Sequence, residues 1–331
     1  MGPSATLVHA GLRTGQHAGW RGGIGQALAI VATTPALWLL GALGFLLRGG
    51  IVVLALPMLA LPSPVAVRLL IGDNLGSAGF TPSFFLLVGV LATGIVALVM
   101  ASLLVAAVAD LAAFERFLVA RHDAGADHPP ARALAPTDRR RLVTGMFTIQ
   151  LLAVCALLAA ALPLVADGIT VTYAELVRPS QSGELYGRVL GQLGGQLLLV
   201  LIVLVPVEAA AALAARRLLR GGFGLARETT PPTALLVGLG RLVLRPLSTW
   251  ATALLGWVIA IGVLAAVVWA IGLVWQAARA ALLDTAVAGA VGVGGAVLAV
   301  IMLCAVWLGG VAVCGAVGAL RAGLWTAEDV R

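Results

Sequence analysis

The sequence predicts an all-α polytopic membrane protein, a bundle of about six transmembrane helices with interfacial amphipathic helices. Hydrophobic residues make up 61% of the 331 residues and charged residues only 11%, less than half of the charged share in a soluble domain. The apolar residues come in runs of about 20, the length that crosses a hydrocarbon core. Because lipid offers the backbone no hydrogen-bond partner, these runs should be helices.

The first span is the one whose limits are hardest to place. Residues 24–47 are apolar enough to cross a membrane. We favour a short interfacial helix at 21–33 and a tilted span that starts at Pro35, since proline suits the first turn of a helix. The predicted spans are 35–61, 84–109, 142–166, 189–215, 247–275 and 285–320.

These spans are expected to form one transmembrane domain over 21–325. Residues 1–20 should be a flexible N-terminus, since they lack the apolar centre of a signal peptide. Residues 326–331 should be a short tail. Four tryptophans near span ends are expected to anchor the helices at the membrane interface. They are Trp38, Trp250, Trp275 and Trp325.

The distribution of arginine predicts the orientation. All 21 basic residues are Arg; 16 lie in the N-terminus, the loops after spans two and four and the C-terminus, and four in the opposite loops. The positive-inside rule then places both termini in the cytoplasm, with the spans in the inner membrane. The net charge of +7 is thus a topology signal, and we expect no nucleic-acid partner.

A second interfacial helix is expected between spans four and five. Gly221, Gly222 and Gly224 should end the helix that continues from span four. Thr230 can cap the next helix, with Pro231 in its first turn. Residues 233–245 carry an apolar stripe flanked by arginine, a pattern typical of helices that lie at the membrane surface.

Glycine spacing predicts where helices pack closely, because small side chains let two backbones approach. One series runs in steps of four at the outer start of span four, and span six has a similar stripe. Packing within one chain is favoured over a dimer interface for both. The predicted packing residues are Gly183, Gly187, Gly191, Gly195, Gly310 and Gly318.

Arg48 is the costliest residue to place in lipid, since an arginine at mid-membrane costs roughly 3 kcal/mol. It lies 13 residues after Pro35. One interpretation is a contact for an anionic lipid or substrate. The favoured one is that Arg48, Gly49 and Gly50 mark a helix break from which the arginine reaches an interface.

Two carboxylates, Asp110 and Glu208, complete the candidate ligand-binding residues. Both lie near the cytoplasmic ends of their spans, before arginine-bearing helix extensions. They could handle a proton or cation together, but we favour neutralisation of nearby arginines. Gln150, Gln192 and Gln196 are expected to form hydrogen bonds across helices. Arg48, Asp110 and Glu208 are expected at different depths.

The sequence contains no recognisable catalytic or cofactor motif. Nucleophile elbows, phosphate loops and dinucleotide fingerprints are absent from the chain. Four residues of types that can bind a metal lie in the loop after span two: His122, Asp123, Asp127 and His128. Their Gly- and Pro-rich surroundings suggest a mobile loop. We therefore expect no catalytic residues, no metal and no cofactor.

Three short segments carry a family resemblance: Gly19-Trp20-Arg21, the run from Pro35 to Gly41, and Arg141-Leu142-Val143-Thr144-Gly145. With the long extension of span two, the chain resembles uncharacterised bacterial six-span integral membrane proteins. These are similar to the membrane domain fused to some glycerophosphodiester phosphodiesterases. In the fused members the phosphodiesterase is a separate barrel, so the resemblance implies no hydrolase activity and no catalytic residues here.

Three functions are compatible with these features. The favoured one is a non-enzymatic accessory or scaffold subunit associated with transport or envelope lipids. Its partners would be anionic lipid headgroups and a membrane protein or a second copy of the chain. The alternative is a permease for a lipid or small amphiphile, with Arg48 lining the path. A membrane-embedded lipid enzyme ranks third, because it needs a polar cluster at one depth.

Overall fold

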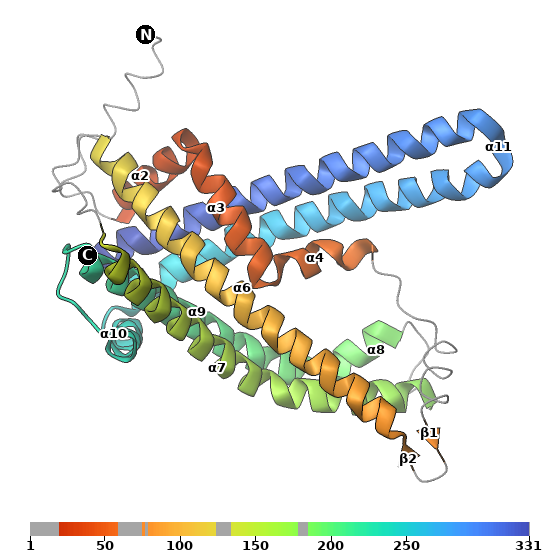
Figure 1. Ribbon diagram of the computed structural model, residues 1–331, viewed down its shortest axis with the longest axis horizontal. Coiled ribbons are helices and arrows are strands. Elements are labelled where there is room, and N and C mark those ends of the chain that lie inside the picture. Colours follow the sequence, from red (N-terminus) through yellow and green to blue (C-terminus); the bar gives the residue numbers. More distant parts are fainter. Residues whose placement is uncertain (1–19, 59–74, 77–78, 124–133, 178–184, 331) are drawn as a thin grey trace. The chain divides into compact units, whose positions relative to one another are not determined.

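The protein is described by a computed structural model that covers residues 20–58, 75–76, 79–123, 134–177 and 185–330 (Figure 1). Helices dominate the part of the chain that the structure describes. The exception is one pair of two-residue antiparallel strands, β1 (Leu75–Gly76) and β2 (Gly79–Phe80). The predicted all-α class is confirmed.

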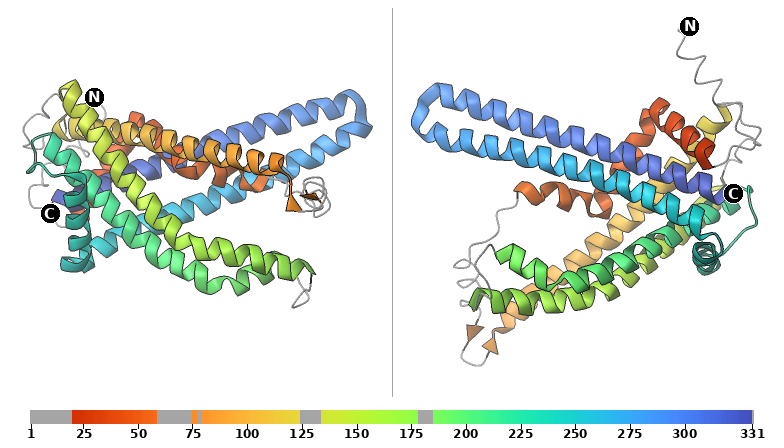
Figure 2. Two further views of the ribbon diagram at one scale, coloured as in Figure 1. Left: turned by 60° about the horizontal axis from the view of Figure 1, so that its bottom comes forward. Right: turned by 180° about the vertical axis from the view of Figure 1, so that it is seen from behind.

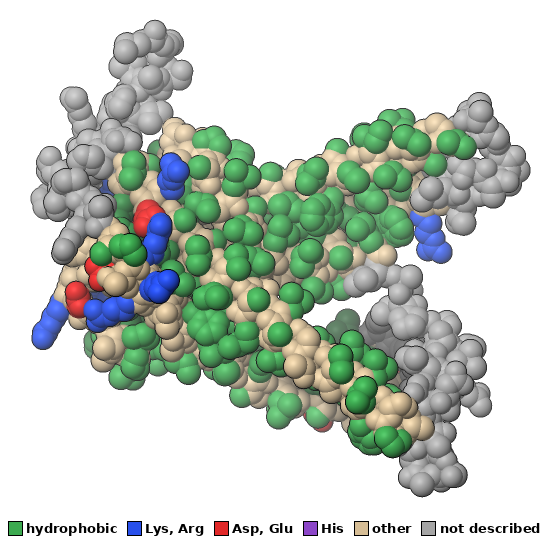
Figure 3. Space-filling model, in the orientation of Figure 1, with side chains coloured by type: hydrophobic (Ala, Val, Ile, Leu, Met, Phe, Trp, Pro, Cys, Tyr) green, Lys and Arg blue, Asp and Glu red, His purple; other side chains and the backbone are tan. Residues whose placement is uncertain are grey.

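Six helical stretches are long and apolar enough to cross a membrane, so the chain is a multi-pass membrane protein. The first stretch begins at Pro35, as predicted. The side chains along the α11 hairpin that face the viewer in Figure 3 are almost all hydrophobic, which suits a surface that meets lipid. The stretches are Pro35–Met58, Pro82–Arg121, Pro136–Thr172, Gly194–Gly222, Pro246–Ala280 and Val293–Asp329.

The first span is interrupted where the sequence predicts a break. Helix α3 (Pro35–Phe45) leads into a π-helical turn, η2 (Leu46–Gly50), in which Arg48 has φ −86° and ψ 19° and Gly49 has φ +97°. A positive φ is readily available to glycine alone, so Gly49 permits the break. Two short helices follow, α4 (Ile51–Ala55) and the 3₁₀ turn η3 (Leu56–Met58).

Helices α6 (Pro82–Asp123) and α7 (Pro136–Val177) are each 42 residues long. At 1.5 Å per residue each measures about 63 Å, roughly twice the hydrocarbon thickness. They therefore carry charged turns beyond their apolar segments. The fourth span starts later than predicted, because α8 (Leu185–Gln192) and α9 (Gly194–Gly222) are separate helices that meet at Leu193.

Both segments predicted to be interfacial helices are helical, as α2 (Trp20–Thr33) and α10 (Pro231–Leu244). Helix α9 ends at Gly222, and Gly224 adopts φ +72° in the connection. Thr230 then caps α10, and its backbone N–H donates to Thr233 Oγ1 at 3.0 Å. The turn chemistry read from the sequence is confirmed.

Helix α11 (Pro246–Val330) contains the fifth and sixth spans. It reverses direction, and its two arms run side by side in Figures 1 and 2. Its last turns differ from the prediction of a separate tail over 326–331. The helix continues through Val330, and Thr326, Glu328 and Asp329 are buried.

The helices group into two compact units, and the predicted single transmembrane domain over 21–325 stays a prediction. Of the described residues, the first unit comprises 20–33, 114–123, 134–177, 185–258 and 320–330, and the second comprises 34–58, 75–76, 79–113 and 259–319. The core of the first unit includes Trp325, which is 6% exposed and thus not the interfacial anchor that was predicted. Its buried neighbours are Ala209, Ala210, Leu213, Leu242 and Ala253.

Candidate functional site

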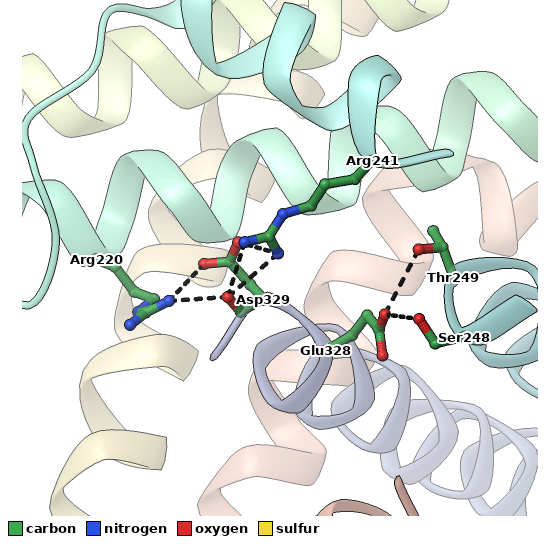
Figure 4. Close-up of polar contacts among 6 residues, drawn as sticks. All are labelled: Arg220, Arg241, Ser248, Thr249, Glu328 and Asp329. Atoms are coloured by element: carbon green, nitrogen blue, oxygen red, sulfur yellow. Dashed lines mark hydrogen bonds and ion pairs between the residues drawn. The ribbon is translucent and has the colours of Figure 1, made fainter. Parts of the chain in front are cut away.

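A buried polar cluster of the first unit lies where α11 ends. We call it the C-terminal clamp; it comprises Arg220, Arg241, Ser248, Thr249, Glu328 and Asp329 (Figure 4). The Asp329 side chain is 2% exposed and lies 3.0 Å from Arg220 Nη1 and 2.8 Å from Arg241 Nη1. Both arginines also donate to the Asp329 carbonyl oxygen. One carboxylate thus joins α9, α10 and α11.

The second acidic residue of the clamp connects the two ends of α11. Ser248 Oγ donates to Glu328 Oε1 at 2.7 Å, and Thr249 lies at 3.5 Å from the same oxygen. Thr249 is 1% exposed. The start and the end of one 85-residue helix are therefore held together by buried polar groups. Sequence reasoning missed this site, although two adjacent carboxylates after an apolar span were its signal.

Glu208 on α9 is engaged by Arg321 on α11. The Arg321 Nη2 group donates to Glu208 Oε1, and the same guanidinium lies 5.2 Å from the centroid of the Trp257 ring. A cation over an indole face is stabilised by the quadrupole of the ring. Arg321 is thus held by a carboxylate and an aromatic ring of the first unit.

Arg48 and Asp110 form an ion pair in the second unit. The Arg48 side chain is 44% exposed and that of Asp110 is 20% exposed, so the pair is open on one side. The helix break at Gly49 places Arg48 beside α6 at this point.

The three predicted ligand residues are therefore divided between two ion pairs. Arg48 and Asp110 were expected at different depths, but they are in contact. The two carboxylates do not act as a pair, since Glu208 binds Arg321. Each neutralises an arginine, as favoured from the sequence, yet the partners are 62 and 113 residues away rather than on the adjoining helix extensions.

A charge swap tests the pair in the second unit. Arg48→Ala removes the guanidinium that neutralises Asp110, and we expect the free energy of unfolding to fall by about 1–2 kcal/mol because the site is partly open. The double variant Arg48→Asp, Asp110→Arg should recover most of the loss. A double-mutant cycle by denaturant titration in micelles measures the coupling. Additive losses, with no recovery in the swap, would refute the pairing.

An arginine of α9, Arg216, packs against an aromatic ring of α6 in the first unit. The Arg216 side chain is 7% exposed, and its guanidinium carbon lies 5.8 Å from the centroid of the Phe114 ring. Phe114 in turn packs on Phe223, with centroids 5.6 Å apart.

Polar side chains also link α7 to the helices that follow it. Glu175 is 3% exposed, accepts a hydrogen bond from Arg188 Nε at 2.8 Å and accepts a second from Gln192. Gln196 Nε2 donates to Asp167 at 2.8 Å. The predicted cross-helix hydrogen bonds of Gln192 and Gln196 are confirmed.

The glycine series differ in what they face. Gly183 lies outside the described residues. A Cβ atom at Gly187, Gly191 or Gly195 would meet nothing within 4 Å, and the break at Leu193 interrupts the series. The described residues therefore show no close packing at these three glycines, and their predicted packing within one chain stays a prediction. Contact with a second copy stays a prediction.

The stripe in span six lies against other helical segments of the second unit. A Cβ at Gly310 would lie 2.5 Å from Val267 Cγ1, and one at Gly318 would lie 3.3 Å from the Gly41 carbonyl oxygen. Gly315, a residue of span six that the spacing did not single out, also lies in a close approach. A Cβ there would lie 2.8 Å from the backbone nitrogen of Ala42.

Comparisons with known proteins add no functional assignment. A scan against protein-family models, a search of curated proteins and a search of solved structures each find no match. The resemblance to phosphodiesterase-linked membrane domains stays a prediction. Within the described residues, no three His, Cys, Asp or Glu side chains are grouped to hold a metal; Asp127 and His128 lie outside them.

Proposed function

We propose that this chain is a non-enzymatic integral membrane protein that acts as an accessory or scaffold subunit associated with transport or envelope lipids. The main support for this proposal is that its candidate ligand residues pair with one another or with another residue of the chain. Arg48, Asp110 and Glu208 each form an ion pair that joins helices far apart in the sequence. These ion pairs connect helices, and the three residues do not gather at one binding site.

The binding surface in this proposal is the arginine-rich side of the spans, which the positive-inside rule assigns to the cytoplasm. Arg139 and Arg141, at the start of α7, are 55% and 67% exposed. Each such arginine near an anionic membrane surface contributes about 1 kcal/mol of attraction.

Helix α10 has the surface expected of a helix at the membrane interface. Its inner face buries Gly238 against the Ala210 carbonyl oxygen, and Leu242 is 7% exposed. On its outer side Leu236 is 68% exposed and Val243 is 78% exposed. An exposed apolar face beside arginine favours a position in the headgroup region.

Native mass spectrometry of gently solubilised protein tests the proposal. We expect a second polypeptide at fixed stoichiometry in the wild type, retained in Arg48→Ala. The matched surface variant combines Arg139→Gln, Arg140→Gln and Arg141→Gln. This triple variant should lose the second polypeptide if these arginines form the interface. Preparations of both proteins without any bound polypeptide would contradict the subunit role.

A permease remains the second candidate, because the Arg48 side chain is 44% exposed at a helix break within a span. Proteoliposomes with fluorescent anionic and zwitterionic lipids in one leaflet test it. Transfer between leaflets that disappears in Arg48→Ala and persists in Arg140→Gln would favour a permease. Equal transfer by vesicles with and without protein would exclude lipid transfer.

A further inference from the structure

The open ion pair of the second unit, Arg48 with Asp110, presents a positive and a negative charge side by side. We propose that this pair binds the zwitterionic headgroup of a phospholipid with a primary ammonium group, as in phosphatidylethanolamine. The phosphate accepts hydrogen bonds from Arg48, and the ammonium donates to Asp110. This inference deepens the proposed association with envelope lipids and rests on it, but it requires no protein partner.

Arg48 has hydrogen-bond donors that its own chain leaves open. A guanidinium carries five N–H donors. Among the described residues, the hydrogen bond from Nη2 to Asp110 Oδ2 is the only one that Arg48 forms. The Arg48 side chain is 44% exposed, so a ligand can reach the other N–H groups. Adjacent N–H groups of a guanidinium match the oxygens of a phosphate, often through two parallel hydrogen bonds.

Charge balance selects the class of headgroup. Arg48 and Asp110 compensate each other, so an anionic headgroup on Arg48 would leave an uncompensated negative charge beside the carboxylate. Such a charge is costly in a partly enclosed site. A zwitterionic headgroup adds no net charge, and its ammonium supplies N–H donors to the carboxylate. Because the choline nitrogen carries no N–H, an ethanolamine headgroup fits the pair better than choline or glycerol.

The pair lies at the end of a long apolar run of α6. Residues 82–109 carry no charged side chain, and Asp110 is the first one that follows. These 28 residues measure about 42 Å at 1.5 Å per residue, and a bilayer with its headgroup regions is about 40–45 Å thick. Asp110 therefore lies at the level of the headgroups, and the break at Gly49 brings Arg48 into contact with it.

Exposed apolar side chains lie next to the pair along the chain. Ile51 and Val52 follow the break and are 52% and 58% exposed, and Val108, just before Asp110, is 49% exposed. Acyl chains can cover such side chains, whereas a water-soluble phosphate ester leaves them uncovered. The surroundings of the pair thus favour a lipid over free phosphoethanolamine.

Native mass spectrometry of the full chain tests the site by the fraction of protein that carries one added lipid. The lipids are phosphatidylethanolamine, phosphatidylcholine and phosphatidylglycerol with equal acyl chains. The site variant combines Arg48→Gln with Asp110→Asn, which leaves the net charge unchanged. Its affinity for phosphatidylethanolamine should fall about tenfold, as expected for the loss of a charge-assisted hydrogen bond.

The matched control combines Arg321→Gln with Glu208→Gln, which also removes one ion pair at constant net charge. Arg321 is more enclosed than Arg48: its side chain is 23% exposed and its guanidinium lies over the Trp257 ring. The control should bind phosphatidylethanolamine as tightly as the wild type. Equal binding by the wild type and the site variant, or equal losses in both double variants, would overturn the proposal.

The single variant Asp110→Asn separates this site from a general attraction to lipid. Its affinity for phosphatidylethanolamine should fall, because the ammonium loses its carboxylate. Its affinity for phosphatidylglycerol should rise, because no carboxylate then repels the phosphate. Misfolding would weaken both, and equal losses for the two lipids would count against the site.

Addition of soluble phosphoethanolamine distinguishes the two sources of the headgroup. Binding as tight as that of the lipid would keep the chemistry of the pair and assign it a water-soluble ligand. The same spectra report any second polypeptide. Absence of that polypeptide would contradict the subunit role and leave the lipid site standing, so the two proposals fail separately.

Discussion

Asp329→Ala is expected to lower the free energy of unfolding by about 3–5 kcal/mol, because it leaves two arginines partly buried without their shared carboxylate. The Asp329 side chain is 2% exposed, and Arg220 and Arg241 are 21% and 22% exposed. Denaturant titration in micelles measures the change. Protease resistance should fall at the C-terminal end of α11 and around α10, since both lose the clamp.

The matched control is Glu228→Ala. Glu228 also pairs with an arginine, Arg141, but their side chains are 69% and 67% exposed. An exposed pair contributes about 0–1 kcal/mol. If the two alanine variants lose equal stability, burial of Asp329 is not the cause of its effect. Asp329→Asn should fall between them, since it keeps hydrogen-bond acceptance and loses the charge.

Gly315→Ala is expected to cost about 3 kcal/mol, the upper part of the range for overpacking, because the added methyl group meets backbone rather than a flexible side chain. Its Cβ would lie 2.8 Å from the Ala42 nitrogen and 2.7 Å from the Ala42 Cβ. Gly41→Ala should have a similar effect, since its Cβ would lie 2.9 Å from the Ala319 nitrogen. The measurement is the midpoint of unfolding in micelles.

Gly309→Ala is the control for helix propensity. Gly309 lies on the same arm of α11, and a Cβ there meets nothing within 4 Å. Alanine in an open helical position should stabilise the helix by up to about 1 kcal/mol. A stabilised Gly315→Ala variant would show that α3 and this arm of α11 are not closely packed.

Many helix starts, ends and breaks were predictable because they depend on proline and glycine residues at those positions. Pro35 and Pro231 start helices, Gly222 and Gly224 end one, and Gly49 permits the break in the first span. Each depends on a few neighbouring residues. The limits that failed, such as the start of α9 at Gly194, lie within apolar sequence that has no such marker.

The candidate site was predictable only in part. Arg48, Asp110 and Glu208 stand out as charges within or beside apolar runs, so the sequence identifies them as residues that need partners. It cannot name those partners. The Glu208 partner, Arg321, is 113 residues away, and the packing of helices decides that pairing.

The sequence by itself determined the number of spans, the residues that start and end most helices, and the excess of arginine in alternate loops, because hydropathy and turn chemistry act over short distances. Only the tertiary structure decided that Glu328 and Asp329 are buried rather than in a polar tail. Carboxylates are favourable in water and can be buried only where polar partners reach them: Arg220 and Arg241 neutralise Asp329, and Ser248 donates a hydrogen bond to Glu328.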